Sequence, residues 1–249
     1  MKSHKFPNVL ITGSAGDIGS GLSACFLERG HRVLGLDIAA CAPEHLREKQ
    51  HFYYECCDLT NPEVTREKIK RFVETHGEIQ IIINNVGLIY NKPIVSYLDG
   101  KLTTHSNHDW NKVISVTLTT AFHVTASCVQ HILEKSEGGI VINISSISAD
   151  GNPGQSAYSA AKGAINSMTK AQAKELGAFG IRVAAIAPGF IDTSSTIKAM
   201  GSEGIKKLKR SIPLRRLGTV SEVCHAAVFI VENEYFTGSI LELNGGLSI

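Results

Sequence analysis

Short segments rich in β-branched residues recur along the chain, and longer segments with helical periodicity separate them. The segment Ile79-Gln80-Ile81-Ile82-Ile83 shows the first pattern most clearly, because it is apolar on both faces. A strand of this kind belongs in a sheet that is covered on both sides, which means parallel strands under helices. The alternation of strands and helices therefore predicts an α/β fold with a doubly wound sheet.

Seven segments are predicted as strands of this sheet, which we expect to be mostly parallel with helices on both faces. They are Asn8–Thr12, Arg32–Asp37, Phe52–Cys57, Ile79–Asn84, Gly139–Ser145, Arg182–Ala187 and Ser239–Leu243.

The segments between these strands carry helix signals. Asn61-Pro62-Glu63 offers an N-cap, a proline for the first helical position and an acid for the helix dipole. Thr219 and Glu222 form a capping box that opens the last helix. Two longer helices are predicted over Asn107–Lys135 and Ser156–Ala178.

The composition excludes several classes of protein. A chain of 249 residues with 43% hydrophobic residues can bury a large core, and a net charge of +2 argues against a nucleic-acid-binding surface. The six cysteines show no CxxC spacing, which predicts reduced thiols in a cytoplasmic protein. The ten histidines form no HExxH motif, so we predict no metal site. No apolar run reaches the ~18–20 residues of a membrane span, so we expect no membrane partner.

A glycine-rich turn follows the first predicted strand, in Thr12-Gly13-Ser14-Ala15-Gly16-Asp17-Ile18-Gly19. Such a turn before a helix lets backbone N–H groups approach a pyrophosphate at the positive helix end. Asp37 closes the second predicted strand, where a carboxylate can accept hydrogen bonds from the adenine ribose. Asp37 would repel the extra phosphate of NADP, and the turn contains no lysine or arginine. The sequence therefore predicts a preference for NAD over NADP.

Further motifs follow the later strands, and together they resemble the short-chain dehydrogenase/reductase family. They are Thr12-Gly13 with Ile18-Gly19, Asp58-Leu59, Asn84-Asn85-Val86-Gly87, Ser145-Ser146, Tyr158-Ser159-Ala160-Ala161-Lys162, Pro188-Gly189-Phe190-Ile191-Asp192-Thr193 and Asn244-Gly245-Gly246. The set looks closest to the branch of 3-oxoacyl-carrier-protein reductases and sugar-alcohol dehydrogenases.

The resemblance implies one Rossmann-type domain over residues 1–249, a substrate lid at about 192–217, and a homotetramer built partly through the two long helices. It also implies a set of cofactor-binding residues. These are Gly13, Asp17, Ile18, Gly19, Asp37, Asp58, Leu59, Asn85, Val86, Gly87, Tyr158, Lys162, Pro188, Gly189, Ile191 and Thr193.

Tyr158 and Lys162 lie four residues apart on a predicted helix, where they share one face. Hydride transfer to a carbonyl leaves an alkoxide that must be protonated, and a phenol with a pKa near ~10 is a poor participant. We expect the positive charge of Lys162 to lower the pKa of Tyr158. In the resembled family, this lysine also holds the nicotinamide ribose, and a serine hydroxyl binds the substrate oxygen.

The catalytic serine is either Ser145 or Ser146. The strand register counted from Gly139 favours Ser146, whereas the family's commonest separation from the tyrosine favours Ser145. We predict Ser146, with Tyr158 and Lys162, as the catalytic set. A second Tyr-x-x-x-Lys motif at Tyr97 straddles the turn signal Asp99-Gly100, so we assign it no chemistry.

Two residues depart from the family pattern. Asp17 stands where the cofactor turn usually has glycine, and its carboxylate should repel a pyrophosphate unless it points outward or caps the helix. Thr117 stands where the long helix usually has an asparagine that holds a water of the proton relay. A threonine hydroxyl could hold a water too.

Two segments are expected to line the substrate side. Leu88–His108 is longer than the family's usual connection, and Asp192–Leu217 lies where the family has its lid. In the lid, Ile205, Leu208 and Ile212 fall on one helical face. The remaining face is basic, and it is either a solvated surface or a dock for an acidic carrier or phosphorylated sugar. Its cations are Lys206, Lys207, Lys209 and Arg210.

The sequence thus predicts an NAD(H)-dependent oxidoreductase that interconverts a secondary alcohol and a ketone and resembles the 3-oxoacyl-carrier-protein reductases. Its substrate is expected to be a small molecule or an acyl thioester. A sugar or polyol dehydrogenase, a dehydratase or epimerase with the same residues, and a non-catalytic dinucleotide sensor remain as alternatives.

Overall fold

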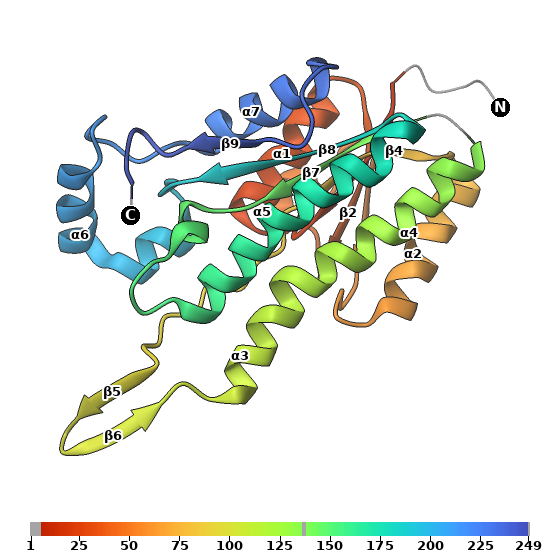
Figure 1. The fold of residues 1–249 in the computed structure, drawn as a ribbon. Helices are drawn as coiled ribbons and strands as arrows, with labels where there is room; N and C mark the ends of the chain where they lie inside the picture. The colour runs from red at the N-terminus through yellow and green to blue at the C-terminus, as the bar shows by residue number, and fades with distance from the viewer. Residues whose placement is uncertain (1–5, 136–137, 249) are drawn as a thin grey trace.

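A seven-stranded parallel sheet forms the centre of the computed structural model, which describes residues 6–135 and 138–248 (Figure 1). The strand order is β3-β2-β1-β4-β7-β8-β9. The bounds are β1 Asn8–Thr12, β2 Arg32–Asp37, β3 Phe52–Cys56, β4 Ile79–Asn84, β7 Gly139–Ile144, β8 Ile181–Pro188 and β9 Ile240–Leu243. Each predicted strand is confirmed to within one residue at either end, and every pairing in this sheet is parallel.

The strand order reverses at β1, which pairs with β2 on one side and β4 on the other. Thr12 lies opposite Leu36, and Asn84 lies opposite Asn143, so the carboxyl ends of these strands meet at one edge. In open α/β sheets, a crevice forms outside the carboxyl ends at such a reversal, and ligands bind there. The strand order alone therefore predicts a ligand site at the carboxyl ends of β1 and its neighbouring strands.

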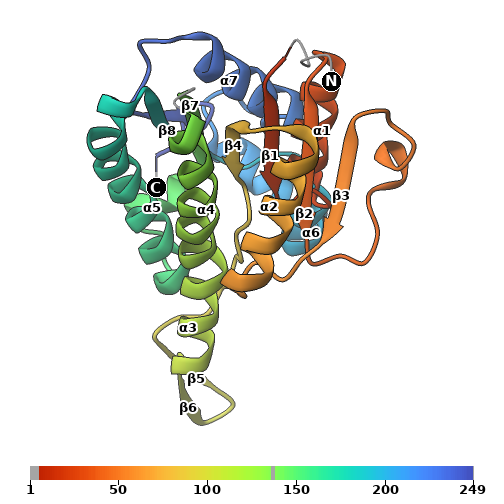
Figure 2. The same cartoon turned by 90° about the vertical axis from the view of Figure 1, so that its right-hand side faces the viewer.

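Helices cover both faces of the sheet, as predicted (Figure 2). On one face, Phe26 of α1 and Ile230 of α7 pack against the strands. On the other face, Phe72 of α2, Ile132 of α4 and Ala173 of α5 form a second core. The bounds are α1 Asp17–Glu28, α2 Pro62–His76, α4 Thr120–Lys135, α5 Ser156–Leu176 and α7 Val220–Glu232.

The helix predicted over Asn107–Lys135 consists of α3 (Asn107–Ile114), a π-helical turn (Ser115–Thr119) and α4. By length and mean hydropathy alone, this helix could cross a membrane, and among the described residues no other helix could do so. Its contacts with β4, α2 and α5 instead make it a core helix of the α/β fold.

A two-stranded antiparallel hairpin projects from the body between β4 and α3 (Figure 2). It comprises β5 (Val95–Leu98) and β6 (Lys101–Thr104). The predicted turn signal is present, since Asp99 and Gly100 both have positive φ, as a tight hairpin turn requires. The two strands themselves were not predicted. We call residues 91–105 the arm.

The lid segment contains α6 (Ser194–Ser211), which has a break at Gly201. Leu208 and Ile212 are buried, and Ile205 packs against them, which confirms the predicted apolar face. The start of α6 is tied to the glycine turn, because the backbone N–H and the hydroxyl of Ser194 both donate to Asp17, each at 2.6 Å.

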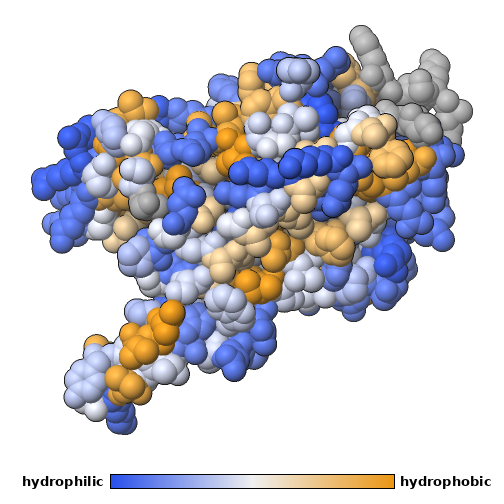
Figure 3. All heavy atoms as spheres, in the orientation of Figure 1, coloured by the Kyte–Doolittle hydropathy of each residue, from blue (hydrophilic) through white to orange (hydrophobic). Residues whose placement is uncertain are grey.

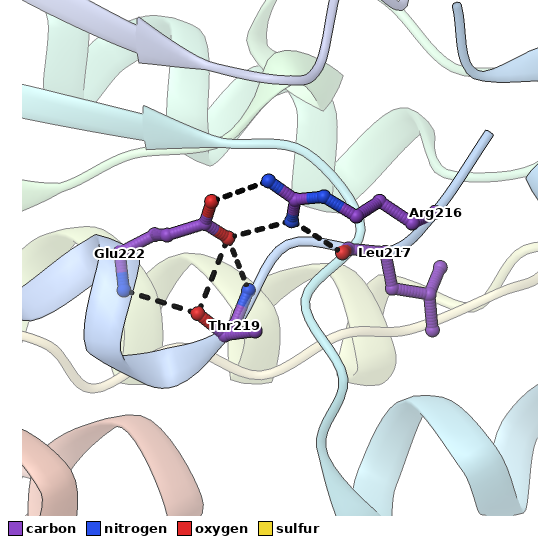
Figure 4. A network of polar contacts seen from close by, with 4 residues as sticks. All are labelled: Arg216, Leu217, Thr219 and Glu222. Carbon is purple, nitrogen blue, oxygen red and sulfur yellow. Dashed lines mark hydrogen bonds and ion pairs between the residues drawn. The ribbon is translucent and has the colours of Figure 1, made fainter. Parts of the chain in front are cut away.

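The far end of the lid is held by a polar network around the start of α7 (Figure 4). Both terminal nitrogens of the Arg216 guanidinium donate to the Glu222 carboxylate, and Thr219 completes the predicted capping box. The Arg216 hydrogen bonds lower the pKa of Glu222 to about 2. Arg216 is therefore paired and does not add to the exposed basic face of α6.

A chain of buried amide and hydroxyl side chains links two central strands to the helices that pack on them. Asn84 donates to Thr125 and to Asn143, and Asn143 donates to Thr169, each at 2.9 Å. These bonds join β4 and β7 to α4 and α5. Buried polar groups need such partners, because an unpaired one loses its hydration without compensation.

We expect Asn143→Ala to lower the free energy of unfolding by about 1–3 kcal/mol, because it leaves Asn84 and Thr169 without this partner. Urea denaturation followed by circular dichroism measures the change. The control Thr125→Val removes one bond at the end of the chain and should cost less. An Asn143→Ala protein as stable as the wild type would show that the network contributes nothing.

Candidate active site

A cavity of about 500 Å³ opens at the carboxyl ends of the central strands, in the crevice that the topology predicts. Every residue that the sequence assigned to cofactor binding or catalysis lines it, from Gly13 near the start of the chain to Thr193. Residues far apart in sequence thus meet in one place, because the parallel strands deliver their following loops to the same edge of the sheet.

The glycine turn is shaped by close backbone approaches. Gly13 has a φ of +65°, and a Cβ built on Gly19 would lie 2.0 Å from the Gly13 carbonyl oxygen. The Asn85 amide donates to the carbonyls of Thr12 and Gly13 at 3.1 and 3.2 Å, which joins the end of β4 to the turn. Position 19 therefore accepts only glycine without a shift of the backbone.

Asp17, the residue that departs from the family's glycine, begins α1 and borders the cavity. Its carboxylate accepts hydrogen bonds from the N–H and the hydroxyl of Ser194 in the lid. The carboxylate is thus turned toward α6. The sequence had offered an outward orientation or a helix cap, and the contact with Ser194 directs the carboxylate to the lid while Asp17 still borders the cavity.

Asp37 is fixed at the end of β2 by two backbone donors. Its two oxygens accept from the N–H groups of Ala15 and Ala39, each at 2.9 Å. Among the described residues that line the cavity, three are acidic, namely Asp17, Asp37 and Asp58, and the single cation is Lys162.

Lys162 is only 2% exposed, and its ammonium donates to the Ile144 carbonyl oxygen at 2.6 Å. Burial lowers the pKa of Lys162 to about 8, because the charged form loses its hydration. The Lys162 Nζ lies 5.7 Å from the centre of the Tyr158 ring. The predicted shared face of these two residues is confirmed.

The predicted direction of the Tyr158 pKa shift is wrong for this structure. Burial raises the pKa of Tyr158 to about 12, and a hydrogen bond with Ser146 opposes the rise only in part. The phenol lies among apolar neighbours that include Val113 and Ala157, which disfavour a phenolate. Tyr158 is accordingly held as a proton donor.

The two candidate serines have different surroundings. Ser146 hydrogen-bonds Tyr158, and its Oγ accepts from the Ser148 N–H at 3.1 Å. Ser145 is buried, and its Oγ lies 3.4 Å from the Lys162 backbone oxygen. The geometry therefore places Ser146, and not Ser145, against the tyrosine hydroxyl.

Thr117 is fully buried in the π-helical turn, and its hydroxyl accepts from the Leu88 N–H at 3.1 Å. This bond fixes the chain immediately after Gly87, where the cavity wall passes beside Lys162. Thr117 thus supports the wall of the site through a backbone contact.

Sequence reasoning missed a cluster of polar residues before Tyr158. The Gln155 Oε1 atom accepts from the Ser148 hydroxyl and the Asn152 amide, each at 3.0 Å, and its Nε2 atom donates to Asn91 at 2.6 Å. Gln155, Ser148 and Asn152 all line the cavity. The three-residue spacing between Gln155 and Tyr158, close to one helical turn, is the signal that could have found it.

Among the described residues, no group of three or more His, Cys, Asp or Glu side chains is placed to hold a metal ion. All six cysteines are free thiols.

Comparison with known proteins agrees with this geometry. Residues 13–248 match the model of a family described as enoyl-(acyl carrier protein) reductase. The chain belongs to the short-chain dehydrogenase/reductase family. Among its relatives are 3-oxoacyl-(acyl-carrier-protein) reductases from Chlamydia muridarum, 31% identical over 96% of each chain, and from Thermotoga maritima, 34% identical over 96% of this chain and 97% of the other.

One solved structure has the same fold over nearly the whole chain. The ligand-free aldohexose dehydrogenase of Thermoplasma acidophilum has a TM-score of 0.86 and 26% identity, and the match covers 97% of this chain and 93% of the other. The chain is accordingly an oxidoreductase of this family that acts on CH–OH groups, which leaves the non-catalytic sensor without support.

The family uses a nicotinamide dinucleotide, and the cavity fits one. The turn from Gly13 to Gly19 lines the cavity with glycine backbone that no side chain covers at Gly13, Gly16 and Gly19, and it lies at the positive end of α1. A fixed carboxylate, Asp37, stands at the end of the next strand, where the ribose of a dinucleotide lies in this fold.

We expect Gly19→Ala to weaken dinucleotide binding at least 100-fold, because its methyl group would displace the Gly13 carbonyl and deform the turn. Isothermal titration calorimetry measures the affinity. The matched control is Gly177→Ala, whose added Cβ meets nothing within 4 Å. Unchanged affinity in the Gly19→Ala protein would place the dinucleotide elsewhere.

Proposed function

We propose that the protein is an NAD(H)-dependent oxidoreductase that interconverts a secondary alcohol and a ketone, with a 3-oxoacyl thioester as the ketone substrate. The observation that carries this proposal is the meeting of the Ser146 hydroxyl, the Tyr158 phenol and the buried Lys162 ammonium in one cavity. The names of the relatives, which are reductases of 3-oxoacyl groups on a carrier protein, support the substrate class.

In the proposed site, the glycine turn holds the pyrophosphate, Asp37 holds the adenine ribose, and Lys162 and Tyr158 hold the nicotinamide ribose. The loops after the strands complete the wall with Asp58, Leu59, Asn85, Val86 and Gly87 on one side and Pro188, Gly189, Ile191 and Thr193 on the other. When bound, the dinucleotide supplies the hydride to the carbonyl carbon.

The protein's own groups manage the carbonyl oxygen. Ser146 and Tyr158 donate hydrogen bonds to it and fix its position in the cavity. As the oxygen gains negative charge, Tyr158 transfers its proton to it, so that the ketone, the hydride and this proton together give the alcohol. Lys162 then stabilises the resulting phenolate by its positive charge until Tyr158 regains a proton from solvent.

Two features of the cavity bear on the substrate. Its lining includes Leu88, Ile89 and Phe190, which suit an acyl chain. The basic face of α6 outside the cavity complements an acidic carrier, and its cations are exposed. A sugar is the second candidate, because Gln155 and Asn152 add amides to the wall and a related structure is an aldohexose dehydrogenase.

The oxidation of NADH by 3-oxoacyl thioesters, compared with the reduction of NAD by sugars, tests the proposal. We expect Tyr158→Phe and Ser146→Ala to lower kcat with the thioester at least 100-fold, because each removes a donor to the carbonyl oxygen. Ser145→Ala is the matched control and should lower kcat less than fivefold.

Two results would contradict this assignment. If the protein turns over sugars and no thioesters, the proposed thioester substrate is wrong, but the proposed catalytic residues are not contradicted. Equal losses in the Ser145→Ala and Ser146→Ala proteins would remove the assigned role of Ser146.

Asp37 is the basis of the proposed preference for NAD. We expect kcat/KM to favour NAD over NADP at least tenfold, and Asp37→Asn to reduce that ratio, because it removes the charge that repels the additional phosphate. Asp58→Asn removes another carboxylate of the same cavity and should leave the ratio within twofold. A lower KM for NADP than for NAD in the wild type would refute the preference.

We also propose that residues 1–249 act as one domain, in a cytoplasmic homotetramer. The large apolar side chains that α4 leaves exposed, Phe122 and Leu133, support an assembly through the long helices.

A further inference from the structure

The arm is an amphipathic ribbon. In an antiparallel pair, residues that lie opposite each other share a face. Tyr97 lies opposite Leu102, and Val95 lies opposite Thr104, so one face carries two large aliphatic side chains and an aromatic ring. The pairs Ser96 with Thr103 and Leu98 with Lys101 form the other, more polar face.

The apolar face of the arm is open to solvent. Tyr97 is 73% exposed and Leu102 is 67% exposed, and the neighbouring Ile94 and Val95 are also exposed. The turn between the strands projects farthest from the body (Figure 2). A lone two-stranded ribbon is marginally stable in water, and a contiguous exposed apolar surface marks an interaction site. The arm therefore needs a partner surface.

The long helix next to the arm carries an exposed apolar stripe. Trp110, Phe122 and Leu133 are all exposed, although they belong to large apolar types. Phe122 and Leu133 are 11 residues apart, which is about three helical turns and keeps them on one side. The π-helical turn between Trp110 and Phe122 takes up about one extra residue and brings Trp110 toward the same side.

The arm and the helical layer expose apolar surface on the same side of the molecule. Figure 3 shows hydrophobic atoms along the arm and in patches over the region of α4 and α5, all in one view. A two-fold axis that runs parallel to this side would pack two copies face to face, with each arm opposite the helical layer of the other copy. In such an isologous contact, the arm of each copy meets the long helix of the other copy, so the same pair of surfaces forms two equivalent contacts.

We propose that the arm packs its apolar face on the α3–α4 helix of a second copy of this chain, in a reciprocal contact. A four-residue strand is roughly 13 Å long, which matches between two and three turns of a helix. A stable dimer buries about 800 Å² per partner, and the reciprocal contact gives each copy an arm and a stripe to contribute. This assigns the arm a role that a general assembly through the long helices does not include.

The contact also reaches the active site through the base of the arm. The Lys92 N–H donates to the Gly154 carbonyl at 2.7 Å, and Asn91 accepts from Gln155 at 2.6 Å. Gly154 and Gln155 belong to the loop that precedes Tyr158. Packing of the arm on a second copy therefore restricts the motion of this loop. The effect on catalysis rests on the proposed function, because it acts through Tyr158.

The test compares the two faces of the ribbon. The variant Tyr97→Ser/Leu102→Ser removes apolar side chains from the open face, and Ser96→Asn/Thr103→Asn alters the opposite face at the neighbouring pair. By sedimentation velocity, we expect the first variant to raise the dissociation constant of the assembly at least tenfold and the second to change it less than twofold. Circular dichroism checks that both variants keep the fold.

A photoreactive benzoylphenylalanine at position 97 locates the partner directly. We expect a cross-linked dimer whose joined peptide falls within residues 107–135. Unchanged assembly of the apolar-face variant, or a cross-link to another segment, would overturn the proposal. So would binding of the wild-type monomer to phosphatidylcholine vesicles through the arm, because the apolar face would then serve a membrane.

The kinetic consequence is measured separately. We expect the apolar-face variant to raise the KM for the substrate at least threefold with kcat changed less than twofold, because the loop before Tyr158 is less ordered. The sedimentation and cross-linking results need no substrate. Their failure is therefore distinguishable from failure of the proposed reaction, and an unchanged KM in a dissociated variant would remove only the link to the site.

Discussion

The hydrogen bond from the buried Lys162 ammonium to the Ile144 carbonyl joins the two parts of the structure on which the site depends. Ile144 is the last residue of β7, and Lys162 lies on α5, so the bond connects the carboxyl edge of the sheet to the helix that carries Tyr158. A charge buried to this degree is tolerated only where a polar partner compensates for its lost hydration. The fold supplies that partner because Ile144 ends β7, which places its carbonyl group at this edge of the sheet, within reach of Lys162.

The same edge arranges the other half of the cavity. The glycine turn after β1, the carboxylate at the end of β2 and the amide after β4 all lie where parallel strands end. The close approach of Gly19 to the Gly13 carbonyl then shapes the turn, and Asn85 ties it to β4. The lid is connected to this turn by Ser194 and Asp17, which places the first residue of α1 in contact with the substrate side.

Much of the fold was predictable, and the reason is physical. Strands that are apolar on both faces belong in a covered sheet, so their positions and parallel direction followed from the pattern of apolar residues and from the helices between the strands. The arm escaped prediction because β5 and β6 have four residues each, carry serine, threonine and lysine, and pair with no other strand among the described residues. A local sequence pattern identifies a buried core strand more readily than a strand of a short, exposed ribbon, because the exposed strand lacks a run of apolar residues.

The site was predictable as a list of residues, but its electrostatics were not. The spacing of Tyr158 and Lys162 located the pair, yet the burial that raises the pKa of Tyr158 arises from Val113 and Ala157, whose packing no motif encodes. The partner of Asp17 lies 177 residues away in sequence, so its orientation could not be read locally. Gln155 was one helical turn from the tyrosine and could have been found.

The pH dependence of kcat/KM for carbonyl reduction tests the central claim most directly, namely that a protonated Lys162 supports proton donation by Tyr158. Because the pKa of Lys162 is lowered to about 8, its ammonium is present below pH 8 and is lost above it. The pKa of Tyr158 is raised to about 12, so the phenol keeps its own proton over this range. We predict that kcat/KM is constant between pH 6 and 7.5 and falls about tenfold per pH unit above about 8. A profile that stays flat to pH 10, or rises there, would contradict the account.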